Sequence, residues 1–124
     1  MLCKTAEIAA GLGTIPAGRL ANYVREAIGG LVSAVTSFGI LGPAILGVSL
    51  LETSGYRFGV SQDWLPATQE PADRADLIIP EMRIEGIEAV TDVDSIARPT
   101  LDVLWQRFDV ERCDAYDQNG KWIG

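Results

Sequence analysis

Apolar residues recur every three or four positions between residues 16 and 37, which is the spacing of one face of an α-helix. That face consists of Leu20, Tyr23, Val24, Ala27, Ile28, Leu31 and Val35. Pro16 suits the first helical turn because its missing N–H would have no partner there, and Gly39 is a common way to end a helix. The pattern predicts an amphipathic helix over about residues 16–37.

Two adjacent glycines, Gly29 and Gly30, lie in the middle of this predicted helix. Each glycine costs roughly 1 kcal/mol relative to alanine in a helix interior, so their presence requires a structural reason. They either mark a kink or allow another backbone to approach closely. In the second case Gly29 and Gly30 are candidate contacts with a partner.

A continuous apolar run follows at residues 44–51, between two sequences rich in turn residues. Its length predicts a strand buried on both faces, with a short helix as the alternative. Residues 56–60 alternate, with their aromatic residues on one side, and this predicts a half-buried strand. We expect Ser54-Gly55 to form a hairpin turn between the two strands.

The second half of the chain opens on an irregular stretch, at about residues 61–76, whose prolines and polar residues predict a loop. Polar and apolar residues alternate in the region that follows, which Pro80 interrupts. Met82, Ile84 and Gly86 would face inward, with charged residues between them facing out. A β region is therefore expected on both sides of Pro80.

A second amphipathic helix is predicted over about residues 95–108. Its apolar face consists of Leu101, Leu104, Trp105 and Phe108. Pro99 would open this helix, or Asp94 would cap an earlier start with Pro99 tolerated near the first turn. Near the C-terminus, Asn119-Gly120 is a strong signal for a two-residue hairpin because both positions tolerate positive φ.

These elements predict a single α+β domain over residues 1–124. Two amphipathic helices, at about 16–37 and 95–108, would pack on a small and mostly antiparallel sheet. A C-terminal β-hairpin would complete the fold, and the loop at about 61–76 would lie within the domain rather than divide it.

The segment 27–51 contains no charged side chain over 25 residues, which meets the length criterion for a membrane-spanning helix. Gly39, Gly42 and Pro43 lie near its middle, where a helix exposed to lipid would lose backbone hydrogen bonds. We therefore favour a soluble core over a membrane segment. The N-terminal sequence is a poor signal peptide because Glu7 interrupts its apolar region, so we expect a cytoplasmic protein.

The net charge of −7 is unevenly distributed along the chain. Residues 1–62 carry four basic and three acidic residues, whereas residues 63–124 carry six basic and fourteen acidic ones. Nucleic-acid binding normally depends on clustered Lys and Arg side chains that contact phosphate. The acidic half therefore argues against DNA or RNA as a partner.

The composition also restricts the available chemistry. The chain has no histidine, which removes the commonest general base, the commonest zinc ligand and the histidine-dependent nucleophilic pairs. Its two cysteines, Cys3 and Cys113, are far apart in sequence and are interpreted as reduced thiols. No nucleotide-binding loop is recognisable, so no cofactor is expected.

Carboxylates are the remaining candidates for catalysis. Glu81, Glu85, Asp92 and Asp94, with Glu88 nearby, could hold Mg²⁺ or Ca²⁺ in a metal-dependent enzyme. The same charges would also protect an exposed strand edge from aggregation, and we favour that interpretation.

Two tryptophans are candidate anchors for a partner. Trp64 lies in the predicted loop and Trp122 lies next to the C-terminus, whereas Trp105 belongs to a predicted core face. Together with Gly29 and Gly30, Trp64 and Trp122 form the set of possible partner contacts. The sequence thus favours a small, acidic, non-catalytic interaction module that forms a homo-oligomer or docks on a larger protein. A membrane-anchored protein with an acidic tail and a carboxylate-based metal enzyme are the alternatives.

Overall fold

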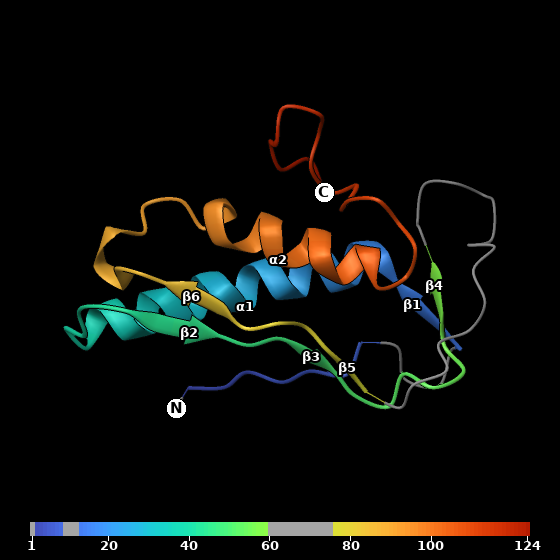
Figure 1. The fold of residues 1–124 in the computed structure, drawn as a ribbon, viewed down its shortest axis with the longest axis horizontal. Coiled ribbons are helices and arrows are strands. Elements are labelled where there is room, and N and C mark those ends of the chain that lie inside the picture. Colours follow the sequence, from blue (N-terminus) through green and yellow to red (C-terminus); the bar gives the residue numbers. More distant parts are fainter. Residues whose placement is uncertain (1, 9–12, 60–75) are drawn as a thin grey trace.

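Two α-helices and three short strand pairs make up the fold, which we describe from a computed structural model for residues 2–8, 13–59 and 76–124 (Figure 1). The elements in chain order are β1 (Thr14–Pro16), α1 (Ala17–Ser37), β2 (Ala44–Leu46), β3 (Ser49–Leu50), β4 (Arg57–Gly59), β5 (Leu77–Ile78), β6 (Met82–Ile84), the 3-10 helix η1 (Ile87–Ala89) and α2 (Asp94–Gln106). The predicted α+β class, with helices packed on mostly antiparallel strands, is confirmed. The strands form separate two-stranded pairs rather than one sheet.

Helix α1 occupies the residues that the apolar periodicity predicts. Pro16 lies just before it, in an extended conformation, so the helix proper begins at Ala17. Its end is a Schellman motif: Gly39 has φ +72, its N–H donates to the Thr36 carbonyl, and the Ile40 N–H donates to the Val35 carbonyl. Gly39 therefore ends α1, as the sequence predicts.

Helix α2 begins at Asp94, so the prediction that Pro99 opens the helix is wrong and the alternative of an earlier start is confirmed. Asp94 does not cap the helix as that alternative expected, because the N-cap position is Val93 and no side chain caps it. Hydrogen bonds to Asp92 stabilise the first turn, which precedes Pro99 in the sequence. An Asp92 carboxylate oxygen accepts the Asp94 N–H at 3.0 Å, and the Ser95 hydroxyl donates to the Asp92 carbonyl at 2.6 Å. Pro99 removes one hydrogen bond from the helix interior, and burial of the apolar face on both sides of it compensates.

Strands β2 and β3 pair antiparallel with β6 and β5, forming one ribbon that lies in front of α1 (Figure 1). Alternate residues of its first strand, such as Leu46 and Leu50, pack against the core. The residues between them face away, and Ile45 is 65% exposed. The prediction of a strand buried on both faces is therefore wrong, because only one side of this ribbon is covered by α1.

The second strand of the ribbon, made of β5 and β6, agrees with its sequence pattern. Pro80 separates β5 from β6, and Met82 and Ile84 are half-buried between exposed charged residues. The predicted alternation beyond Pro80 is confirmed.

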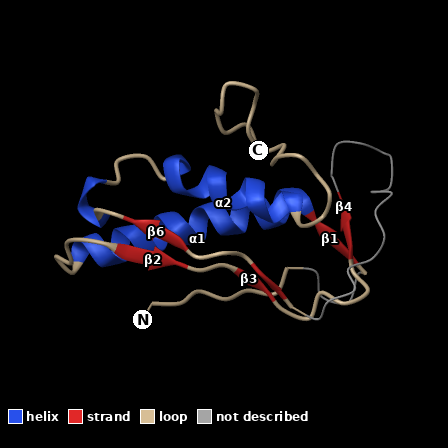
Figure 2. Cartoon of the chain, in the orientation of Figure 1, coloured by secondary structure: helices blue, strands red, loops and turns tan. Residues whose placement is uncertain are grey.

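Strand β4 pairs in parallel with β1, at the end of the molecule away from the turn that follows α1 (Figure 2). The turn at Ser54-Gly55 is present, with φ +83 at Gly55, but the predicted hairpin is wrong because β3 pairs with β5 instead. The physical reason is Phe58, whose side chain is fully buried beside β1 and α2. Burial of this ring draws β4 away from β3.

An aromatic cluster forms the centre of the core. Phe58 stacks on Phe108 with ring centroids 4.6 Å apart and meets Trp105 edge-to-face at 4.8 Å. The Trp105 indole N–H donates to an Asp114 carboxylate oxygen at 3.2 Å, so the buried ring keeps a polar partner. The apolar faces of α1 and α2, with Leu20 and Leu104, surround these rings.

The C-terminal hairpin is present as a turn closed by a single antiparallel bridge between Tyr116 and Trp122. Gly120 has φ +81, and the Asp117 N–H donates to the Lys121 carbonyl at 2.8 Å. A turn is therefore present at Asn119-Gly120, but the predicted two-residue loop is wrong. Residues 118–120 form a three-residue loop between Asp117 and Lys121, and of these three only Gly120 has a positive φ.

The uncharged segment 27–51 divides into three parts: the second half of α1, a turn, and strands β2 and β3. Among the described residues, no helix combines the length and the apolar character needed to cross a membrane.

Candidate functional site

The carboxylates that were candidates for a metal site do not converge on one point, and each has its own surroundings. Glu85 pairs with Arg83 at 2.8 Å, and a Glu88 oxygen accepts the Gly42 N–H at 2.9 Å. That hydrogen bond lowers the pKa of Glu88. Glu81 is exposed. Within the described ranges, no three acidic or cysteine side chains are grouped so that they could hold a metal ion.

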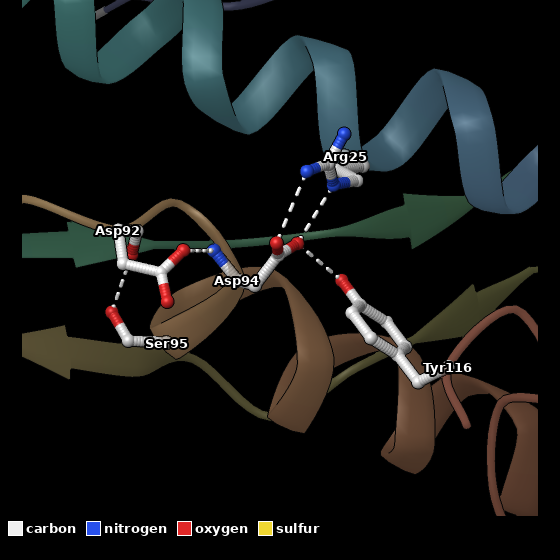
Figure 3. A network of polar contacts seen from close by, with 5 residues as sticks. All are labelled: Arg25, Asp92, Asp94, Ser95 and Tyr116. Atoms are coloured by element: carbon white, nitrogen blue, oxygen red, sulfur yellow. Dashed lines mark hydrogen bonds and ion pairs between the residues drawn. The ribbon is translucent and has the colours of Figure 1, made fainter. Parts of the chain in front are cut away.

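Asp94 belongs instead to a cluster that joins three parts of the chain (Figure 3). Arg25 on α1 donates through Nε and Nη2 to the two carboxylate oxygens of Asp94, at 2.7 and 3.0 Å. The Tyr116 hydroxyl donates to Asp94 Oδ1 at 2.8 Å. The Arg25 guanidinium also lies over the Trp122 ring, 4.7 Å from its centroid. We call these four residues the Arg25 cluster.

The pKa shifts within the Arg25 cluster are those expected of a structural contact. The hydrogen bond from Arg25 lowers the pKa of Asp94, and the same bond raises the pKa of Arg25. Burial raises the pKa of Tyr116, and its hydrogen bond to Asp94 acts in the same direction. All three groups therefore keep their protonation states around neutral pH, whereas an acid–base catalyst needs a pKa near the working pH. The cluster ties the C-terminal segment and α2 to α1.

Cys113 is not an activated nucleophile. Cys113 is buried in the core, where burial raises its pKa to about 12, so the thiol stays protonated at neutral pH. Its backbone N–H donates to an Asp102 carboxylate oxygen at 2.9 Å. Cys3 is exposed, and both residues are free thiols.

The structure gives the predicted partner contacts different surroundings. Trp122 is half-buried, with one ring face against Arg25 and with Tyr116 edge-to-face at a centroid distance of 5.2 Å. Trp64 lies outside the described residues. A Cβ added at Gly29 would touch the Val93 side chain at 3.6 Å, and one at Gly30 would meet the Lys4 ammonium at 2.6 Å. Both glycines therefore face neighbours from their own chain, and α1 continues through them without interruption.

The sequence analysis did not identify the exposed apolar residues that the structure reveals. Six large apolar side chains that lie on or beside the segment 38–51 or on its paired strand are 50% to 72% exposed. They are Phe38, Ile40, Leu41, Ile45, Leu51 and Ile78. We call this set the apolar surface. Single exposed apolar residues are normal on proteins, whereas large contiguous apolar patches occur mainly where a protein contacts another protein, a membrane or a ligand.

The register of the ribbon places part of the apolar surface on one face. Ser49 lies opposite Ile78, so Leu51, two residues further along, is a diagonal neighbour of Ile78. Ile45 lies opposite Arg83 and shares the outward side with Ser49 and Leu51, because exposure alternates along the whole strand. Phe38, Ile40 and Leu41 continue the set in the turn after α1. Half-buried and exposed residues alternate along residues 44–51. This alternation depends on tertiary packing, so the uniformly apolar sequence does not reveal it.

No family model, curated protein or solved structure matches this chain.

Proposed function

We propose that this chain is a small, acidic, non-catalytic module that binds a protein partner through the apolar surface. The observation that carries the proposal is the exposure of Ile45, Leu51 and Ile78 on the outer face of a ribbon whose inner face is already packed. A chain stabilised by its inner face gains nothing in folding from apolar side chains on the outer one, whereas a binding partner would bury them.

The surroundings of the apolar surface support the same proposal. Segment 38–51 carries no charged residue, although the whole chain has a net charge of −7. Depletion of charge with a rim of charged residues is typical of the centre of a protein interface. Arg83 and Glu85 on the neighbouring strand, which pair with each other and are exposed, would provide such a rim.

A cytoplasmic location fits this proposal. Cys3 and Cys113 are both free, as is usual in a reducing compartment.

Site-specific photo-crosslinking in the cells that produce the protein tests the proposal. A photoreactive amino acid at Ile45 should give a light-dependent adduct with a protein. The same group at Ile123, which is 62% exposed on the C-terminal segment, is the matched control and should give little or no adduct. Absence of a protein adduct at Ile45, or equal labelling at both positions, would contradict the proposal.

A further inference from the structure

We infer that the occupant of the apolar surface is a second copy of this chain, related to the first by a two-fold axis. This inference rests on the proposed function and names its partner.

The charge distribution favours a second copy. Two chains of net charge −7 repel each other wherever their acidic surfaces meet, and most of the acidic residues lie in residues 63–124. Segment 38–51 is uncharged, so two copies can meet through it without placing like charges in contact, with the exposed Glu81, Arg83 and Glu85 of the paired strand at the rim of the contact. A partner selected by charge would be basic, and it would bind the acidic half of the chain rather than this segment.

The available area is of the size that a homodimer needs. Six large apolar side chains, each at least half exposed, supply on the order of 500 Å² of apolar surface. A stable interface buries about 800 Å² on each partner, and in homodimers about two-thirds of it is apolar. The six side chains together therefore supply an area close to the apolar part of one such interface, and three of them, Ile45, Leu51 and Ile78, lie on the outer face of the ribbon.

The geometry of the ribbon suits two-fold stacking. Its inner face packs on the core through residues such as Leu46 and Met82, while the outer face is free of any described element (Figure 1). Two such outer faces would stack like the layers of a β-sandwich, about 10 Å apart, each backed by its own α1. In a two-fold contact the same residues serve both partners, so Ile45 and Ile78 would each enter the interface twice.

The test is the dissociation constant of the purified full chain, measured by sedimentation equilibrium without detergent. The wild-type chain should sediment with the mass of two chains at high concentration. Ile45→Asp or Ile78→Asp would place two uncompensated charges in each dimer and should raise the dissociation constant at least about 100-fold. Ile123→Asp, with similar exposure on the C-terminal segment, should change it by no more than about 2-fold.

A second variant protects the test against misfolding. Ile45→Thr keeps a β-branched side chain and strand propensity but loses apolar area, and it should still raise the dissociation constant roughly 10-fold. Circular dichroism of each variant under monomeric conditions verifies that the ribbon is retained.

Four outcomes would overturn the inference. A wild-type chain that stays monomeric while Ile45 crosslinks to a different protein refutes the second copy and leaves the proposed function intact. A dimer that tolerates Ile45→Asp and Ile78→Asp shows that another surface joins the copies. A monomer that binds phosphatidylcholine vesicles, and loses this binding in Ile45→Asp, assigns the apolar surface to a lipid surface. A monomer without any adduct at Ile45 refutes the inference and the proposed function together.

Discussion

The helical side of this molecule and the outer face of its β ribbon differ in how far their large apolar side chains are buried. Where α1, α2 and the C-terminal segment meet, large groups such as Leu20, Trp105 and Tyr116 are buried, and the partly buried charges of the Arg25 cluster are paired. On the outer ribbon face, apolar groups such as Ile78 stand in solvent and the charged pair Arg83–Glu85 is exposed. The comparison indicates that the helical side supplies most of the stability, whereas the outer face of the ribbon leaves apolar area exposed.

The largest expected contrast between the two regions comes from removing one large apolar side chain from each. Trp105→Ala deletes a fully buried ring and its contact with Phe58, and should destabilise the fold by about 3–5 kcal/mol. Ile78→Ala removes a side chain that is 70% exposed and should change the stability of the monomer by no more than about 0.5 kcal/mol. Urea unfolding at low protein concentration measures both. A similar loss for the two variants would abolish the distinction.

An intermediate effect is expected from the charged groups. Asp94→Ala leaves Arg25 partly buried without its carboxylate and Tyr116 without its acceptor, and should cost about 2 kcal/mol. Glu85→Ala breaks the exposed pair with Arg83 and should cost about 0.5 kcal/mol or less. Urea midpoints of the two variants at neutral pH make the comparison, and a loss in Glu85→Ala as large as in Asp94→Ala would refute it.

The pH dependence sharpens the same prediction. Because the pKa of Asp94 is lowered in the folded state, its contribution is fully present above the ordinary carboxyl pKa of about 4. It is lost as the pH falls further, through the lower pKa of the folded state. The stability difference between wild type and Asp94→Ala should therefore be constant from pH 7 to about pH 5 and shrink below about pH 4. A difference that stays constant down to about pH 2 would show that Asp94 acts through packing instead.

The smallest effects concern the glycines. Gly29→Ala and Gly30→Ala should each stabilise α1 by about 0.5–1 kcal/mol, because alanine favours the helix and the Lys4 tip beside Gly30 is flexible and exposed. Gly59→Ala should destabilise instead, since its Cβ would lie 2.7 Å from the Thr14 side chain in the β1–β4 pair. Thermal unfolding compares the three variants. A loss of stability in Gly30→Ala would show that the Lys4 contact is rigid.

Local sequence patterns predict the parts of this fold that depend on local rules. The periodicity of α1, the Gly39 terminus and the Asn119-Gly120 turn follow from neighbouring residues, and the structure confirms them. The burial of residues 44–51 could not be predicted in the same way, because it depends on how many faces another layer covers. Nor could the partner of β4, since the position of Phe58 in the core decides it.

Local sequence patterns also fail to predict the candidate site. Arg25 and Asp94 are 69 positions apart, and no local pattern indicates that two charged residues at such a distance will meet. The apolar surface was also missed, because an uninterrupted apolar run gives no sign of which residues will face outward. Exposure of Ile45 and Leu51 is decided by the register with β6 and β5.

The strand pairing also affects how fast a single chain can fold. Each of the three described strand pairs joins strands that are not consecutive in the sequence: β1 with β4, β2 with β6 and β3 with β5. Closing such long loops costs chain entropy before any contact is gained, whereas α1 and α2 form from near neighbours. We therefore expect this protein to fold more slowly than helical bundles of similar size, whose contacts are mostly local.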